Sequence, residues 1–423
     1  MRSIFLFLFI ISFHGFAQDP GTPQLINYYT GKAQKYLDKE KALSSFYSID
    51  DKGIMIFANA IDKTKKKPEF SLAWEQLEDF RLYYKYYDEI FSYYKKGRVD
   101  PFPVKAADTV KPPPEKPLQG YRIAIDPGHI AHDHATGSLE MKHLKFRKDV
   151  VNGLVDSIEI SEGILTFATA RLLKDKLEAE GAEVMITRPE GYSAFGKTFE
   201  QWKKQDLKKA VDSLAKIGEL KPDQKNYFLS AKAKNSDIFR VVFRELDLAK
   251  RAELINRYKP DLTIIIHYNV DETNSGWTKP GKKDFNMAFV GGAFMKNDLT
   301  SPEKRFEFLR LLITEDLERS VELSSSVINS FESALGIPTC GNHDATYITE
   351  GCLPTEARGV FCRNLQLTRY IHSPLVYGES IYQDNIKEAQ LLNKETDKTK
   401  NERVMQVADA YFNGIMNYAA KRK

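Results

Sequence analysis

The stretch Asp-Leu-Thr-Ile-Ile-Ile-His-Tyr-Asn, residues 261–269, predicts a buried strand that ends in polar residues. Its apolar run, residues 262–266, is too short and too rich in β-branched side chains to favour a helix. Near-continuous apolar strands are typical of parallel sheets that helices cover on both faces. In such sheets, ligands gather beyond the carboxyl ends of the strands, which is where His267 falls.

Two other apolar runs end in the same way. Tyr-Arg-Ile-Ala-Ile-Asp-Pro-Gly-His, residues 121–129, ends at His129, and Pro-Leu-Val-Tyr-Gly-Glu, residues 374–379, ends at Glu379. A fourth candidate, Glu162, opens an amphipathic helix. Because the carboxyl ends of parallel strands meet at one edge of a sheet, we expect these side chains to lie together. Two histidines and two carboxylates at one edge indicate a catalytic zinc site, in which three residues bind the metal and one position stays open for water.

Strand and helix patterns alternate from residue 122 to the C-terminus. This alternation predicts an α/β fold, a three-layer sandwich with a largely parallel or mixed central sheet. A small α+β N-terminal domain is expected before it, with helical patterns at residues 25–37 and 73–94 and strands within 44–60. The expected strands of the sandwich are 122–125, 184–187, 262–266 and 288–294, and its expected helices include 163–180, 246–258, 303–335 and 402–420.

Composition suggests four segments. Arg2, the apolar residues 4–11 and Gly-Phe-Ala at 15–17 are typical of a signal peptide, residues 1–17, that is removed on export. Residues 18–104 form the N-terminal domain, whose role the sequence does not indicate, and residues 105–118, with Lys-Pro-Pro-Pro-Glu-Lys-Pro, form a stiff Pro-rich linker. The catalytic domain then spans residues 119–423, with insertions near 130–161 and 190–245.

The same composition narrows the partners and the location. A formal net charge of +4 is too near neutral for a nucleic-acid-binding protein of this length. No segment after residue 17 is long and apolar enough to span a bilayer, so we expect no membrane insertion after signal cleavage. The location predicted is exported, either periplasmic or extracellular. The insertion at 190–245 is compatible with a protein regulator, although no residue in it demands one.

The three cysteines, Cys340, Cys352 and Cys362, are an odd set for an exported chain. One disulfide, Cys352–Cys362 or another pair, is compatible with an oxidising compartment. Their spacing matches no cysteine pattern of a structural zinc site. We favour a structural role for all three.

The candidate residues lie in segments that resemble the zinc-dependent N-acetylmuramoyl-L-alanine amidases, which trim peptidoglycan. The matching segments are Ile-Asp-Pro-Gly-His (125–129), Glu162 with the helix behind it, residues 180–188, residues 250–256, Ile-Ile-Ile-His-Tyr-Asn (264–269), and Arg-Gly-Val (358–360) before residues 374–379. The resemblance implies that His129, Glu162 and His267 bind Zn²⁺ and that Glu379 is the catalytic acid and base. It also implies a peptidoglycan or muropeptide substrate, cleaved at the amide between N-acetylmuramic acid and L-alanine.

Asn269 follows the metal edge of the predicted strand and is a candidate for binding a substrate carbonyl. After His129 the chain lacks the glycines usual in the family, and its gap to Glu162 is longer, so an inserted loop is expected. Glu140 and Glu159 in this loop compete with Glu162 as the third ligand; the helix behind Glu162 favours Glu162, with Glu140 in reserve. Two other functions stay open: a zinc hydrolase of the same fold that cleaves another amide, and a catalytically degenerate protein that binds the cell wall.

Overall fold

The computed structural model describes residues 21–85, 91, 115–154, 156–274 and 276–422. The predicted signal peptide, residues 1–17, and most of the predicted Pro-rich linker lie outside these ranges. Within the described residues, no helix has the length and the apolar character that crossing a membrane requires.

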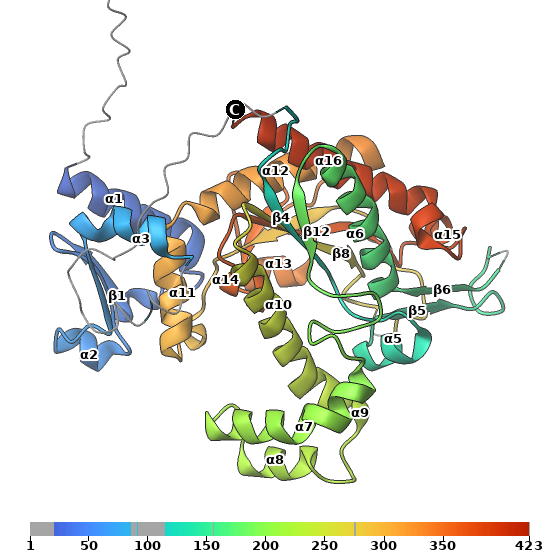
Figure 1. Cartoon of the computed structure of the whole chain (residues 1–423), viewed down its shortest axis with the longest axis horizontal. Helices are drawn as coiled ribbons and strands as arrows, with labels where there is room; N and C mark the ends of the chain where they lie inside the picture. The colour runs from blue at the N-terminus through green and yellow to red at the C-terminus, as the bar shows by residue number, and fades with distance from the viewer. Residues whose placement is uncertain (1–20, 86–90, 92–114, 155, 275, 423) are drawn as a thin grey trace, which may run out of the picture.

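A seven-stranded mixed sheet lies at the centre of the molecule (Figure 1). Four neighbouring strands, β12, β8, β4 and β7, run parallel to one another, whereas β9 runs antiparallel to β12 and β10 antiparallel to β11. The predicted α/β fold with a largely parallel sheet is therefore confirmed. In order across the sheet, the strands are β10 (Cys352–Pro354), β11 (Val360–Arg363), β9 (Met287–Val290), β12 (Leu375–Tyr382), β8 (Leu262–Asn269), β4 (Arg122–Pro127) and β7 (Glu183–Ile186).

Helices cover both faces of this sheet, because its central strands carry apolar side chains on both sides. On one face Ile264 and Ile266 of β8 join the main hydrophobic core with three long helices, α6 (Glu162–Ala179), α12 (Asp316–Leu335) and α16 (Glu402–Ala420). On the other face Ile265 packs with residues of α10 (Arg244–Tyr258) and α14 (Gln366–Tyr370). Residues of α13 (Thr346–Gly351) cover that same face near β9 and β11. The short α15 (Ile386–Leu392) precedes α16.

The expected helix over residues 303–335 is two helices in the structure, α11 (Pro302–Ile313) and α12. The helix is interrupted at Thr314, whose backbone is extended. The buried guanidinium of Arg310 spans this break, binding Glu307 at 2.6 Å and Asp316 at 3.1 Å. The apolar periodicity of the sequence continues through this point, so it could not predict the interruption of the helix.

The insertion after His129 folds into a short helix and a hairpin that lead directly into α6. The helix is α5 (His134–Glu140), and the antiparallel strands are β5 (His143–Phe146) and β6 (Ile158–Ser161). Because β6 ends at Ser161 and α6 begins at Glu162, the hairpin fixes where the Glu162 side chain enters the site. Leu144, Phe146, Ile158 and Ile160 are buried and join the main core.

The insertion at 190–245 is helical and projects from the sheet domain (Figure 1). Its aromatic and aliphatic side chains, including Phe199, Trp202 and Phe243, form a separate hydrophobic cluster, to which Ile130 beside His129 also belongs. Its helices are α7 (Phe199–Lys216), α8 (Pro222–Phe228), α9 (Asn235–Ile238) and the π-helical η4 (Phe239–Phe243), which continues into α10.

The N-terminal region contains a three-stranded antiparallel sheet and short helices. The buried apolar side chains that the structure describes in this region join the main cluster, where Phe306 of α11 packs against Phe70 and Phe80. The buried Lys32 ammonium contacts the Thr314 carbonyl at 2.6 Å. The elements are α1 (Thr22–Lys32), η1 (Ala33–Leu37), η2 (Leu43–Ser45), β1 (Tyr47–Asp50), β2 (Gly53–Ile56), α2 (Ala60–Thr64), β3 (Phe70–Ala73), η3 (Trp74–Gln76) and α3 (Leu77–Tyr83).

The three cysteines are free and buried in this structure. Burial raises the pKa of Cys340 to about 12 and that of Cys352 to about 11, so both are neutral thiols at physiological pH. Cys340 and Cys352 pack in the cluster with Phe289 and Phe361.

We predict that Phe306→Ala destabilises the N-terminal region and the sheet domain together. The side chain is fully buried, and removing a buried phenylalanine costs about 3–5 kcal/mol of unfolding free energy. Urea titrations followed by tryptophan fluorescence and by far-UV circular dichroism should show one transition at a lower midpoint with both probes. Ile61→Ala, at a 64% exposed position of α2, is the control and should stay within about 0.5 kcal/mol of the parent chain. Separate transitions for the two regions would contradict the shared core.

Candidate metal centre and active site

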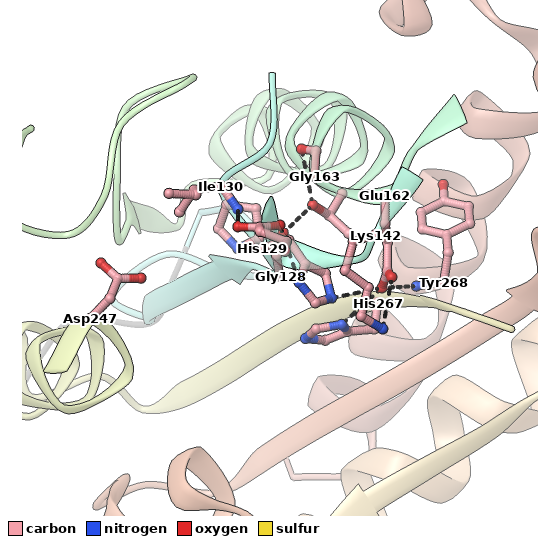
Figure 2. A network of polar contacts seen from close by, with 12 residues as sticks. Gly128, His129, Ile130, Lys142, Glu162, Gly163, Asp247, His267 and Tyr268 are labelled. Carbon is pink, nitrogen blue, oxygen red and sulfur yellow. Dashed lines mark hydrogen bonds and ion pairs between the residues drawn. The ribbon is translucent and has the colours of Figure 1, made fainter. Parts of the chain in front are cut away.

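Three predicted ligands, His129, Glu162 and His267, meet at the carboxyl edge of the parallel strands (Figure 2). Nε2 of His129 lies 3.2 Å and Nδ1 of His267 3.0 Å from the same oxygen, Oε1 of Glu162. The two imidazole rings are nearly perpendicular, with centroids 4.9 Å apart. One ligand atom from each residue lies within 4.8 Å of the others, which is close enough for a single metal ion to bind all three.

Among the described residues, two polar atoms of this group lack a hydrogen-bond partner, as expected of atoms that bind a metal ion. His129 Nε2 and Glu162 Oε2 are buried and make no hydrogen bond within the described part of the chain. Leaving buried polar atoms without a partner costs free energy, so such atoms call for a ligand. Two imidazoles and one carboxylate form the donor set of many hydrolytic metal sites.

The expected protonation states also suit metal binding. Burial lowers the pKa of His129 to about 3, which keeps the imidazole neutral and able to donate a lone pair. Burial alone would raise the pKa of Glu162, but the nearby His129 and Lys142 and the hydrogen bond from His267 outweigh it and hold that pKa well below its usual range. Neutral imidazoles and an ionised carboxylate are the forms that coordinate a cation.

Two neighbouring residues, Tyr268 and Lys142, hold the Glu162 carboxylate and its backbone. The N–H of Tyr268 donates to Oε1 at 3.2 Å, and the Lys142 ammonium lies 3.5 Å from Oε2. Lys142 also accepts the N–H of Glu162 through its own carbonyl at 3.2 Å, and its ammonium lies over the Trp277 ring. Sequence reasoning missed Lys142, because its position depends on the fold of the inserted loop.

The backbone before His129 is packed so closely that Gly128 is required. A Cβ atom at Gly128 would lie 2.3 Å from Cε1 and 2.5 Å from Nε2 of the His267 ring. His129 itself adopts a left-handed conformation with φ of 59°, which is uncommon for a residue with a side chain. Thr166 donates to the Gly128 carbonyl at 2.6 Å, and Arg251 donates to the His129 carbonyl at 3.2 Å.

Buried charged side chains support the backbone around His129. The Arg251 guanidinium also donates to the Pro127 carbonyl at 2.9 Å and pairs with Asp247 at 2.8 Å and Asp126 at 3.4 Å. Asp126 accepts from the Thr187 hydroxyl as well. Arg251 and Asp126 are therefore engaged in pairing inside the protein.

Glu379 lies beside the metal group on the neighbouring strand. The register of β12 against β8 pairs Glu379 with His267, so both side chains leave the sheet on the same face. The ring of Tyr377, two residues earlier, stacks on the His267 ring at 4.5 Å between centroids. Burial and the negative charge of Glu162 raise the pKa of Glu379 to about 7, against the opposing effect of His267.

The structure separates the other candidates from the ligand group. Asn269, at the end of β8, donates its amide to the Tyr347 hydroxyl at 3.1 Å. Glu140 lies on the opposite side of the His129 ring, with Oε2 3.5 Å from Nδ1. Burial raises the pKa of Glu140 to about 7, although the Ile130 N–H and nearby arginines oppose this shift. Glu159 is exposed and pairs with Lys145.

A cavity of about 230 Å³ opens beside the metal group. It lies between the sheet edge and the helical insertion, and several aromatic and charged side chains line it. These include His129, Lys142, Phe239, Phe243, His267 and Tyr377. Its walls combine apolar rings with a few polar groups, as binding sites for small molecules do.

The fold and the site define an α/β amidohydrolase with a His-Glu-His metal-binding group. The sequence model of the N-acetylmuramoyl-L-alanine amidase family matches residues 123–417, more than half of the chain. The chain belongs to this family, and the predicted family resemblance is confirmed. A search of curated protein sequences found no match.

Solved structures that are similar to this chain include several amidases. The CwlD amidase of Clostridioides difficile, solved with the GerS lipoprotein, is 18% identical over 71% of this chain and 99% of its own, with a TM-score of 0.38. An N-acetylmuramoyl-L-alanine amidase of Clostridium difficile 630 is 15% identical over 72% of this chain and 98% of its own, with a TM-score of 0.37. Ami1 of Mycobacterium smegmatis is 14% identical over 72% and 99%, with a TM-score of 0.39.

We predict that Gly128→Ala weakens metal binding although it changes no ligand. The added methyl group would collide with the His267 ring, and the ring has to move for the chain to fold. Isothermal titration with a divalent metal ion should give an affinity that is weaker than that of the parent chain by about tenfold or more. Gly31→Ala is the matched control, because a Cβ at Gly31 meets no atom within 4 Å. Equal affinities for the two variants would contradict the steric argument.

Proposed function

We propose that this protein is an exported zinc-dependent N-acetylmuramoyl-L-alanine amidase. Its substrate is peptidoglycan or a muropeptide, and it hydrolyses the amide between the lactyl group of N-acetylmuramic acid and the L-alanine of the stem peptide. The observation that carries the proposal is the His129–Glu162–His267 group with Glu379 beside it, in a chain of the amidase family.

The ligand set favours zinc over harder cations. Two imidazole nitrogens and one carboxylate suit Zn²⁺, whereas Mg²⁺ and Ca²⁺ prefer oxygen ligands alone. Zinc bound by these residues would polarise the scissile carbonyl and make the attacking water more acidic. The buried atoms without hydrogen bonds, Nε2 of His129 and Oε2 of Glu162, support a site built for a cation.

Glu379 is the proposed acid and base. As a base, its carboxylate takes a proton from the attacking water, and it then donates that proton to the alanine nitrogen as the C–N bond breaks. A pKa raised to about 7 by burial suits both steps, because a group that exchanges protons near neutral pH works best when its pKa is close to that pH. Its position on the strand next to His267 supports this role.

Asn269 and the cavity are the proposed substrate contacts. The Asn269 amide donates to the Tyr347 hydroxyl, and its carbonyl oxygen accepts the Val270 N–H at 2.8 Å, so the side chain would have to turn from these partners to meet the substrate. The cavity beside His129 and His267 offers aromatic rings for the sugar and the Lys142 ammonium for a substrate oxygen.

Export to the periplasm or the cell surface is proposed from residues 1–17, whose sequence is typical of a signal peptide. Peptidoglycan lies outside the cytoplasmic membrane, so an enzyme that cleaves it has to leave the cytoplasm. The proposed mature chain begins near residue 18.

We predict that Glu379→Gln binds zinc as well as the parent chain but loses turnover by about 10²–10⁴-fold. The amide keeps the size of the side chain and removes its ability to exchange a proton. Glu350→Gln, at an exposed position of α13, is the control and should keep parental kcat/KM. Zinc content by atomic absorption and initial rates on a defined muropeptide measure the two properties. Turnover within about tenfold of the parent would refute the assigned role of Glu379.

The function itself is tested by product analysis. Residues 18–423 would be incubated with peptidoglycan fragments, with and without a chelator, and the products identified by mass spectrometry. We expect stem peptides with a free L-alanine amino terminus, whose release stops on chelation and returns with zinc. Cleavage at another amide would replace the substrate proposed here, and a zinc-free, inactive protein would refute the enzyme.

A further inference from the structure

We propose that Glu140 is a positioning residue that holds the His129 imidazole with Nδ1 protonated and Nε2 turned toward the other metal ligands. This inference rests on the proposed zinc site. It assigns a purpose to the inserted helix α5, which ends at Glu140.

The two nitrogens of His129 face two different carboxylates. Nε2 lies 3.2 Å from Oε1 of Glu162, inside the ligand group, and Nδ1 lies 3.5 Å from Oε2 of Glu140 on the other side of the ring. The Glu140 side chain is 5% exposed, and its Oε2 makes no hydrogen bond within the described residues. A small closure of this gap would satisfy both the carboxylate oxygen and the ring nitrogen.

The chemistry of the pair decides which nitrogen carries the proton. When it is ionised, the Glu140 carboxylate only accepts hydrogen bonds, so Nδ1 has to be the protonated nitrogen on the side that faces it. Nε2 then keeps its lone pair for the metal. Histidine ligands of metal ions commonly donate their second N–H to a carboxylate, which fixes both the tautomer and the orientation of the ring.

Glu140 also holds the backbone next to His129. Its Oε1 accepts the N–H of Ile130 at 2.8 Å, directly after the left-handed residue His129. One side chain thus contacts the ring of His129 and the peptide that follows it. This double contact restricts a loop whose conformation is otherwise unfavourable.

The ends of α5 explain why Glu140 is held firmly enough to do this. Asp133 caps the first turn by accepting the Thr136 N–H at 2.8 Å. At the other end Met141 is left-handed, and the Lys142 N–H returns to the Gly137 carbonyl at 2.8 Å. The chain therefore turns sharply after Glu140 and brings Lys142 to Glu162, so the insertion contacts two of the three ligands.

The test compares Glu140→Ala and Glu140→Gln with the parent chain. Zinc dissociation constants would be measured by competition with a chromophoric chelator, and the tautomer of His129 by ¹⁵N-histidine NMR of the zinc-loaded protein. We expect Glu140→Ala to bind zinc about 10–100-fold more weakly and to lose the Nδ1–H signal of His129. Glu140→Gln offers one acceptor oxygen for two donors, so its loss of affinity should be smaller.

Glu159→Gln is the matched control in the same insertion, since Glu159 is exposed and pairs with Lys145. It should keep the parental zinc affinity and the parental NMR signals. Parental affinity and an unchanged His129 tautomer in both Glu140 variants would overturn the inference. If Glu140→Ala fails to fold, the same two measurements on the isosteric Glu140→Gln decide the question. A parent chain that binds no zinc would instead refute the proposed site, which is a distinguishable result.

Discussion

The burial of one carboxylate, Glu162, is the constraint on which the site depends. Its side chain is 1% exposed, and an ionised carboxylate in such a place is costly unless charges and hydrogen bonds surround it. The chain provides the N–H of Tyr268, the Lys142 ammonium and ring nitrogens of two histidines. These partners come from three different segments, so the position of Glu162 ties together the end of β4, the end of β8 and the insertion after His129.

The sheet topology explains how these segments meet. Parallel pairing places Pro127 beside Ile266 and His267 beside Glu379, so the ends of β4, β8 and β12 lie in a row. A shift of β12 by one residue would send Glu379 to the opposite face of the sheet, away from His267. The apolar residues that bury β8 on both faces, Ile264 to Ile266, therefore also determine where the chemistry lies.

Much of this could be predicted from the sequence, because the pattern of a buried strand ending in a polar residue is local. The strands that carry His267 and Glu379 and the strand that ends just before His129 form where their apolar runs predict, and α6 begins at the predicted Glu162. The fold class and the metal-binding group followed from those positions. The individual roles of Glu379 and Asn269 remain proposals.

Other features depend on contacts between distant residues and had no local signal. The antiparallel direction of β9 is set by its pairing with β12, a strand distant in the sequence. The N-terminal sequence is predicted to form a domain of its own, yet Phe70 and Phe80 pack against Phe306 of α11. Arg310 bridges the break at Thr314 by donating to Glu307, Asp316 and the Arg369 carbonyl, contacts that no periodicity reveals.

Both insertions contact the backbone segment that follows His129. Ile130, the residue after His129, is buried in the aromatic cluster of the 190–245 insertion, while its N–H is held by Glu140 of the 130–161 insertion. The carbonyl of His129 accepts a hydrogen bond from Arg251. Arg251 lies on α10, the helix that follows the 190–245 insertion in the sequence. Closely packed protein interiors transmit strain. A movement of either insertion would therefore displace the backbone next to His129, the first residue of the metal-binding group. The two insertions, which lengthen the chain beyond a plain sheet domain, therefore help to shape its site.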